Sequence, residues 1–286
     1  MSQTIDCYGL TDVGQERETN EDQFLIADLD KSMLLRQTSL PPDDHTRLFG
    51  GPQGHLFLVA DGIGGTPGGG KASRLAVETL SRYVLDTLPW FFSLRGHDEH
   101  DLGDELRAAL ESCQRKIKGA QLADPDRGRM GTTLTLAYIL WPRMYVVHAG
   151  DCRAYLYRHD TLHQITRDHT IAQKMVEAGQ LAPDLAESSR WSHVLYNCIG
   201  GGRDDLNPDV YKVTLRAGDT LVLCSDGVAK VVPDGEIAAA VRDGSAEEVA
   251  KRLVARANAA GGPDNITAVV ARFGAAGPGA PGGGAA

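Results

Sequence analysis

The sequence lacks the features that define several large classes of protein. Its five cysteines are scattered and include no Cys-x-x-Cys pair, so we expect neither a disulfide framework nor a thiolate zinc site. No apolar run approaches the roughly 18 residues that span a bilayer, and the first residues lack the charged and apolar regions of a signal peptide. We therefore expect a cytoplasmic protein with no membrane partner.

Basic residues are also in short supply. Lys and Arg number 29 against 38 Asp and Glu, giving a formal net charge of -9, and they form no basic block. This balance argues against nucleic acid as the main partner, whereas the excess of carboxylates suits bound cations. With 286 residues, 42% of them hydrophobic, the chain is long enough for one large domain or two small ones.

The pattern of apolar residues predicts short strands interrupted by pairs of helices. Helices are expected at 71–88, 104–122, 171–178, 233–241 and 246–260. Strands are expected at 5–10, 22–27, 132–140, 144–148, 153–158, 161–165, 211–215, 220–224 and 265–273. Because strands dominate and helices do not alternate regularly with them, the sequence favours a β-sandwich covered by helices over a doubly wound parallel sheet.

Three segments show no core-forming pattern. Residues 30–54 and 180–209 are predicted to be surface segments, and we assign the first of them no chemistry. The tail from 274 contains only Gly, Ala and Pro and is expected to be disordered.

Aspartates recur at the ends of expected strands. Leu58-Val59-Ala60-Asp61-Gly62 is a buried run that stops at a carboxylate, and Asp151, Asp226 and Asp264 hold comparable places in the chain. A lone Asp-Gly is also the commonest hairpin turn, but four strands with the same feature point to a shared site. The polar connector at 14–22 adds further carboxylates.

Such a set of carboxylates has a specific chemical use. Acidic residues that converge without histidine fit two hard divalent cations such as Mg²⁺ or Mn²⁺ better than zinc. Two ions that share a carboxylate and a water can activate that water for in-line attack on a phosphate ester. Arg17, in the same turn as Glu21 and Asp22, is the candidate clamp for the phosphate dianion.

Seven short motifs occur in the order seen in the metal-dependent, type-2C Ser/Thr protein phosphatase family, and the chain resembles the bacterial branch of that family. The motifs are Arg17-Glu18-Thr19-Asn20-Glu21-Asp22, Asp61-Gly62-Ile63-Gly64-Gly65, Met130-Gly131-Thr132-Thr133, Gly150-Asp151-Cys152-Arg153, Thr166-Arg167-Asp168-His169-Thr170, Ser225-Asp226-Gly227-Val228 and Gly262-Pro263-Asp264-Asn265-Ile266-Thr267. The resemblance covers roughly residues 5–272. It implies an α+β fold in which a central β-sandwich of two antiparallel sheets is flanked by pairs of α-helices.

The resemblance also implies a domain organisation. Residues 1–273 would form the catalytic domain, with 30–54 as a surface insertion and 171–202 as a mobile flap beside the substrate cleft. Residues 274–286 would be the disordered tail.

The family's metal-binding roles fall on matching residues of this chain. Asp61 would bridge two ions, the Gly62 carbonyl would bind the second, and Asp226 with Asp264 would hold the first. Asp151 matches the position that binds a third, weaker ion in bacterial members.

Four more residues complete the implied site. Glu21 and Asp22 would serve the second ion, one directly and the other through water, with the order left open. Arg17 would clamp the phosphate, and Asn265 would orient Asp264 by hydrogen bonding, a supporting role around a metal ligand.

Several positions depart from the family pattern. Cys152 replaces a usual Ser, Thr66 stands where bacterial members often have His, and Ile63 stands where animal members have a His proposed as general acid. The leaving-group proton would then come from a metal-bound water or another group. His169 is one alternative, although a structural role is expected for it.

Two other phosphate chemistries fit less well. Gly70-Lys71-Ala72 lacks the hydroxyl that a nucleotide-binding loop places on Mg²⁺. Cys152 and Cys224 lack the partner base and anion loop of a cysteine phosphatase.

Taken together, the residues and the resemblance predict a monomeric hydrolase of phosphoserine and phosphothreonine in proteins. It would depend on two Mn²⁺ or Mg²⁺ ions, with a third in addition, and would act against bacterial-type Ser/Thr kinases. One alternative is a non-catalytic phosphoprotein-binding relative, whose expected mark, loss of Asp61, Asp226 or Asp264, is absent. The other is a small-molecule phosphate hydrolase, for which a closed pocket would be expected.

Overall fold

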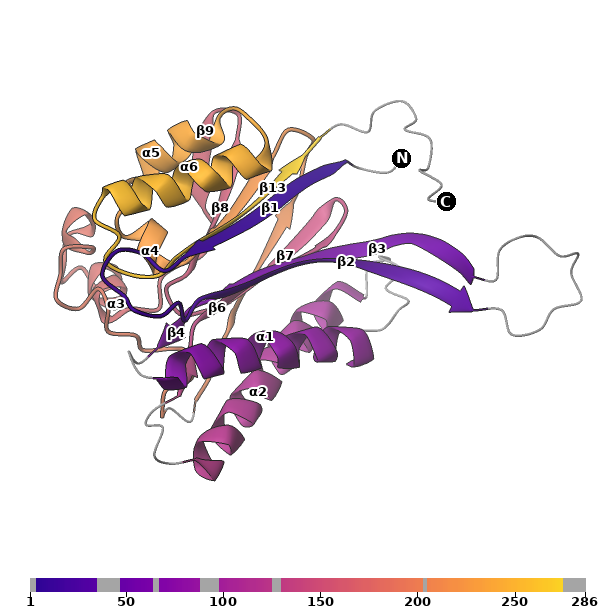
Figure 1. Ribbon diagram of the computed structural model, residues 1–286, viewed down its shortest axis with the longest axis horizontal. Helices are drawn as coiled ribbons and strands as arrows, with labels where there is room; N and C mark the ends of the chain where they lie inside the picture. The colour runs from indigo at the N-terminus through magenta and orange to yellow at the C-terminus, as the bar shows by residue number, and fades with distance from the viewer. Residues whose placement is uncertain are drawn as a thin grey trace, which may run out of the picture.

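The computed structural model describes residues 4–34, 47–63, 67–87, 98–124, 130–202 and 205–274. Two five-stranded antiparallel sheets pack face to face, and helices cover the outer face of each (Figure 1). This arrangement confirms the predicted α+β sandwich flanked by helix pairs.

The strands form two large sheets and one small one. One large sheet has the order β1 (Ile5–Asp12), β13 (Ile266–Phe273), β12 (Thr220–Cys224), β8 (Arg153–Arg158) and β9 (Thr161–Gln164). The other has the order β11 (Asp209–Thr214), β7 (Arg143–Ala149), β6 (Leu134–Leu140), β3 (Arg47–Ala60) and β2 (Gln23–Leu34). The small sheet has the order β10 (Ile199–Gly200), β5 (Gly131–Thr132) and β4 (Gly62–Ile63).

The long helices lie in pairs on opposite sides of the sandwich (Figure 1). α1 (Pro67–Thr87) and α2 (Asp98–Ala123) pack on the sheet that contains β3. α5 (Asp234–Val241) and α6 (Ala246–Ala259) pack on the sheet that contains β13. The shorter helices are α3 (Ile171–Glu177), α4 (Asp226–Ala229) and a 3₁₀ turn at Pro183–Leu185.

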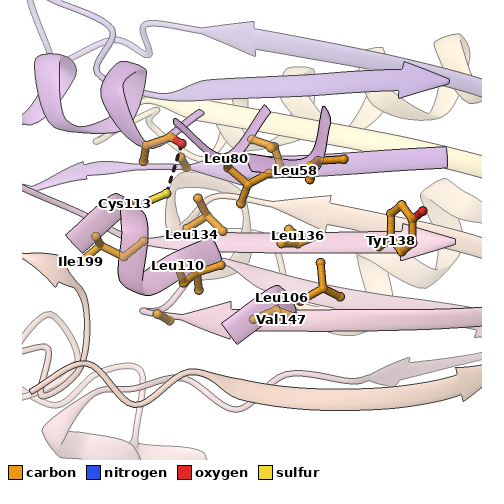
Figure 2. Close-up of a cluster of buried hydrophobic side chains, with 14 of the residues drawn as sticks. Leu58, Leu80, Leu106, Leu110, Cys113, Leu134, Leu136, Tyr138, Val147 and Ile199 are labelled. Atoms are coloured by element: carbon orange, nitrogen blue, oxygen red, sulfur yellow. Dashed lines mark hydrogen bonds between the residues drawn. The ribbon is translucent and has the colours of Figure 1, made fainter. Parts of the chain in front are cut away.

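Strand β3 shows how both faces of a sheet are buried. Leu56 and Leu58 pack toward α1 and α2, in the cluster that Figure 2 shows, while Phe57 and Val59 pack between the two sheets. Successive side chains of a strand point to opposite faces, so a continuous apolar run is what a strand between two packed layers requires. Strand β3 is thus fixed on both sides just before it reaches Asp61.

The expected surface segment at 30–54 is regular structure wherever it is described. Its residues extend β2 to Leu34 and begin β3 at Arg47, forming a hairpin that projects beyond the sandwich (Figure 1). Register shifts on either side of Asp30 interrupt the pairing, and such irregularities break the alternation by which a strand is recognised. Residues 35–46 at its tip lie outside the described residues.

The expectation of a surface segment at 180–209 is wrong at 197–200, where every residue is buried. Cys198 and Ile199 are buried, and Ile199–Gly200 forms β10 against β5. Gly200 has a φ of 77°, and a Cβ there would lie 2.4 Å from the carbonyl oxygen of Met130. Only glycine permits this close approach. In the sequence, however, the same glycines are typical of a flexible loop.

The short helix α4 and the strand β4 are absent from the expected elements, and other differences are at element ends. α1 includes the glycines before Lys71, and α2 begins at Asp98 instead of 104. Of the tail predicted to be disordered, only Gly274 is among the described residues, and Thr66 lies outside them. Within the described ranges, no helix is both long and apolar enough to cross a bilayer.

Candidate metal centre

The predicted site residues meet at one end of the sandwich, where strands of both large sheets begin or end. All but one of them line a cleft of about 1360 Å³. The predicted site residues that line this cleft are Arg17, Glu21, Asp61, Gly62, Asp151, Asp226, Asp264 and Asn265. Asp22 is not among the residues that line the cleft; its side chain is buried.

Three carboxylates form the centre of the site. One oxygen from each of Asp61, Asp151 and Asp226 lies within 4.8 Å of the others. Burial raises the pKa of Asp61 well above its ordinary value, and the charges of Asp226, Asp22 and Asp151 raise it further. Carboxylates held together away from water repel one another unless a cation offsets their charge. The cluster therefore fits bound cations, and it brings the predicted ligand Asp151 together with Asp61 and Asp226.

The backbone around Asp61 is fixed by a neighbouring strand. Its carbonyl oxygen accepts hydrogen bonds from the Thr132 hydroxyl and the Thr133 N–H, both at 2.8 Å. A Cβ at Gly62 would lie 2.5 Å from the Gly69 carbonyl carbon, so no larger residue fits between these backbones. The glycine therefore allows the backbone beside Asp61 to pack directly against the first turn of α1.

Asp22 is buried directly behind the cleft. The Thr267 hydroxyl donates to its Oδ2 at 2.7 Å, while its Oδ1 is buried and has no hydrogen-bond partner among the described residues. Burial raises the pKa of Asp22 to about 7, against the opposing effect of the Thr267 hydrogen bond. An orphaned buried oxygen of this kind is suited to an ordered water or a cation.

Glu21 lies two residues before β2, facing the first turn of α1. Burial raises the pKa of its carboxyl, and a hydrogen bond from the Gly70 backbone opposes the rise. The Ser73 hydroxyl donates to the Glu21 carbonyl oxygen at 2.6 Å. Helix α1 therefore holds both the backbone and the carboxylate of this predicted ligand.

Asn265 fastens the connector that carries Arg17 and Glu21. Its side-chain amide donates to the carbonyl oxygens of Val13 and Thr19, both at 2.9 Å, and its Oδ1 accepts the Glu21 N–H at 2.8 Å. The predicted orienting bond to Asp264 comes from the backbone N–H of Asn265, at 2.9 Å, and not from its side chain. The amide group thus positions Glu21 instead.

Arg17, the predicted phosphate clamp, is engaged within the site. Its Nη2 donates to Asp264 Oδ2 at 2.8 Å, with 46% of the arginine side chain exposed. The pair joins two residues 247 positions apart in the sequence. Arg17 therefore reaches the cleft from the connector, as expected, but contacts a predicted metal ligand there.

Lys230 is a site residue that no sequence motif indicates. Its Nζ lies 2.5 Å from Asp151 Oδ2 and 2.9 Å from Asp226 Oδ2, and only 10% of its side chain is exposed. Although burial alone would lower the pKa of Lys230, Asp226 and Asp151 raise it overall. A helix over 226–230 would have indicated the contact, because residues four apart share a helix face.

The histidine proposed as an alternative general acid does not line the cleft. His169 is buried, its Nδ1 accepts the Gly150 N–H at 3.2 Å, and its Nε2 lies 3.2 Å from Asp209 Oδ2. It is therefore a packing and hydrogen-bonding residue. His193, from the segment predicted as a flap, lines the cleft and is exposed.

The two cysteines near the site are in environments that disfavour the reactive thiolate. Cys152 is fully buried beside the Thr133 hydroxyl, and burial raises its pKa well above the ordinary value. Burial also raises the pKa of Cys224 to about 12. Because the thiolate is the nucleophile, the structure agrees with the expectation that neither cysteine reacts.

Comparison with known proteins identifies the family. The family model described as Protein phosphatase 2C matches residues 35–269, and the chain therefore belongs to the protein phosphatase 2C family. It is 33% identical over 263 residues to protein phosphatase PhpP of Streptococcus pneumoniae, covering 90% of this chain and 93% of PhpP.

Proteins named PstP give a second comparison. The chain is 35% identical over 220 residues to the serine/threonine protein phosphatase PstP of Mycobacterium tuberculosis, which is 76% of this chain but only 40% of PstP. The catalytic domain of PstP has been crystallised in complex with two manganese ions. That structure is 30% identical, covers 96% of this chain and all of the solved chain, and aligns with a TM-score of 0.73.

Proposed function

We propose that this chain is a Mn²⁺- or Mg²⁺-dependent protein phosphatase that hydrolyses phosphoserine and phosphothreonine in proteins. The observation that carries the proposal is the group of oxygens from Asp61, Asp151 and Asp226, all within 4.8 Å of one another in the cleft. Membership of the protein phosphatase 2C family supports it, as does the two-manganese structure of the PstP catalytic domain.

The family resemblance suggests a role for each carboxylate. We assign Asp61 to both ions, Asp226 and Asp264 to the first, and Glu21 and Asp22 to the second. The two ions, when bound, would activate a water and neutralise the charge that develops in an in-line displacement at phosphorus. The carbonyl of Gly62, a residue that lines the cleft, is assigned to the second ion.

The bond that Arg17 makes to a predicted metal ligand competes with its proposed role in binding the substrate phosphate. In the structure it pairs with Asp264, which we assign to a metal ion. A carboxylate that turns toward a cation weakens its bond to a guanidinium, and a half-exposed arginine is then free to take the phosphate in a bidentate bond. We propose that metal binding at Asp264 releases Arg17 for this purpose.

The cleft favours a protein substrate over a small molecule. Its volume of about 1360 Å³ exceeds the range of roughly 300 to 1,000 Å³ that is typical of small-molecule pockets. Asp61, Asp226 and Asp264 are all present, which argues against a non-catalytic binding protein. From the family resemblance we further propose a monomer that acts in cytoplasmic signalling on Ser/Thr kinases and their substrates.

A substrate and metal panel tests the proposal. Phosphate release would be measured from a phosphothreonine peptide, a phosphotyrosine peptide and p-nitrophenyl phosphate, each with EDTA, Mg²⁺, Mn²⁺ or Zn²⁺. We expect activity that requires Mn²⁺ or Mg²⁺ and prefers the phosphothreonine peptide. Activity in EDTA would overturn the metal mechanism, and inactivity on every substrate with metal bound would favour the phosphoprotein-binding alternative.

A further inference from the structure

Lys230 places a positive charge inside the carboxylate cluster. We propose that its ammonium group is a built-in cation which replaces the third metal ion, so that this chain binds two ions and not three. The inference rests on the proposed two-ion site. It assigns to Lys230 a positioning role, in which it holds Asp151 and Asp226.

The contacts of Lys230 leave no room for an ion between the same two carboxylates. Its Nζ lies 2.5 Å from Asp151 Oδ2 and 2.9 Å from Asp226 Oδ2. A Mg²⁺ or similar ion held by these oxygens would sit about 2.0 to 2.1 Å from each, in the space that the ammonium group fills. The two cations would also repel each other at that separation.

The position of Lys230 is determined by the backbone of α4. Its N–H donates to the Asp226 carbonyl oxygen at 2.9 Å, one helical turn back. Gly227 packs so closely on the next loop that a Cβ would lie 2.0 Å from the Asn265 carbonyl oxygen. The lysine side chain therefore starts from a fixed point and extends, largely buried, to the two carboxylates.

The charges of the cluster explain what the lysine contributes. Asp151 has 5% of its side chain exposed and Asp226 has 12%, so both need a positive partner. A lysine supplies one permanently and at any metal concentration, whereas a weakly bound third ion does so only when metal is abundant. Asp151, the residue matched to the third ion, therefore binds the Lys230 ammonium group in place of that ion.

Metal counting without substrate tests the inference. The number of Mn²⁺ ions bound per chain would be measured by equilibrium dialysis with elemental analysis, and by loss of the EPR signal of free Mn²⁺. We expect two ions for the wild-type protein and for Lys230→Arg, which keeps the charge. We expect three for Lys230→Met, because the neutral side chain leaves Asp151 and Asp226 open to a cation.

A matched control separates this effect from a general loss of charge. Lys251→Met removes a lysine that also pairs four residues back on a helix, with Glu247 at 2.6 Å, but on the exposed surface. It should bind two ions. The double variant Lys230→Met with Asp151→Asn should return from three ions to two, because the third ion loses its ligand.

If Lys230→Met fails to fold, the single variant Asp151→Asn still tests the inference. It should bind two Mn²⁺ ions, as the wild-type protein does. Three ions in the wild-type protein and two in Asp151→Asn would show that Asp151 holds a third ion, and would overturn the inference. An unchanged count of two in folded Lys230→Met would also overturn it. Fewer than two ions in the wild-type protein would instead refute the two-ion site, and with it both proposals.

Discussion

Asp61 is the residue on which the proposed reaction depends most, because it is the carboxylate assigned to both ions. We expect Asp61→Ala to lower kcat on a phosphothreonine peptide by at least about 100-fold, since stabilisation of developing charge is the largest contribution that such a site makes. Turnover would be measured with saturating Mn²⁺, and circular dichroism would verify that the variant is folded.

The control for this change is Asp243→Ala, at an exposed position outside the cleft. It should keep wild-type turnover. If folded Asp61→Ala keeps more than a small fraction of the wild-type rate, the dinuclear mechanism is wrong.

His148 gives a residue-scale prediction about pH. It is fully buried, its Nε2 hydrogen-bonds to the Arg167 carbonyl oxygen at 3.0 Å, and burial, helped by nearby His169, lowers its pKa from 6.5 to about 4. Between those values the unfolded chain binds a proton that the folded protein does not. Acidification from pH 6.5 to 4 should therefore remove about 3 kcal/mol of folding free energy at this residue.

The measurement is urea unfolding at a series of pH values. His148→Gln should lose less stability than the wild-type protein between pH 6.5 and 4, whatever its starting stability. His163→Gln changes an exposed histidine and should follow the wild-type curve. Parallel curves for the wild-type protein and His148→Gln would contradict the prediction.

At the scale of elements, the contact between α4 and the loop before β13 aligns the two halves of the site. Gly227 in α4 faces the Asn265 carbonyl oxygen, 2.0 Å from where a Cβ would be. Gly227→Ala must move α4, with Asp226 and Lys230, away from Asp264. We expect a loss of about 2 kcal/mol or more in folding free energy, together with weaker Mn²⁺ binding by isothermal titration calorimetry.

Gly235→Ala is the matched control, because Gly235 lies in α5 and a Cβ there would contact nothing within 4 Å. Alanine favours a helix over glycine by about 0.5 to 1 kcal/mol, so this variant should be slightly more stable and bind Mn²⁺ normally. Normal Mn²⁺ affinity in Gly227→Ala would show that the contact does not align the site.

The elements that the sequence predicts well are those whose signal is local. Strand β3 is recognised because an apolar run ends at Asp61 within a few residues, and β12 is recognised in the same way before Asp226. β10 is missed because its partner, β5, is 67 residues or more away and its own sequence reads as a glycine-rich loop. Pairing over that distance leaves no periodic pattern to detect.

The same reasoning explains which contacts of the site could be predicted from the sequence and which could not. The clustering of Asp61, Asp151 and Asp226 could be expected from their places at strand ends. The contacts of Lys230 could not, because α4 has only four residues and no amphipathic period. Nor could the pairing of Arg17 with Asp264, which depends on how two distant connectors pack.

For the molecule as a whole, the carboxylate cluster makes stability depend on both pH and metal. Burial raises the pKa of Asp22 from 3.8 to about 7, and it raises that of Asp61 well above its ordinary value. In the metal-free protein these groups hold protons that the unfolded chain has already released. The folded state thus binds more protons between pH 4 and 7, and its stability falls as the pH rises through that range.

A bound divalent cation should reverse this dependence, because it favours the ionised carboxylates. We expect the melting temperature in EDTA to fall between pH 5 and pH 7.5, and the increase caused by saturating Mn²⁺ to grow over the same range. Differential scanning calorimetry with and without Mn²⁺ at each pH gives this difference directly. His148 contributes equally to both curves, so its opposite pH dependence cancels in the difference between them and only makes the fall in the EDTA curve smaller.

A carboxylate variant ties the effect to the cluster. Asp61→Asn removes one of the repelling charges, so in EDTA at pH 7.5 it should melt at a higher temperature than the wild-type protein, while its Mn²⁺-dependent increase should largely disappear. Such opposite changes arise when a group that repels its neighbours in the empty site is also the group that binds the ion. A lower melting temperature in EDTA would mean that Asp61 stabilises the fold itself, and that the cluster does not oppose folding.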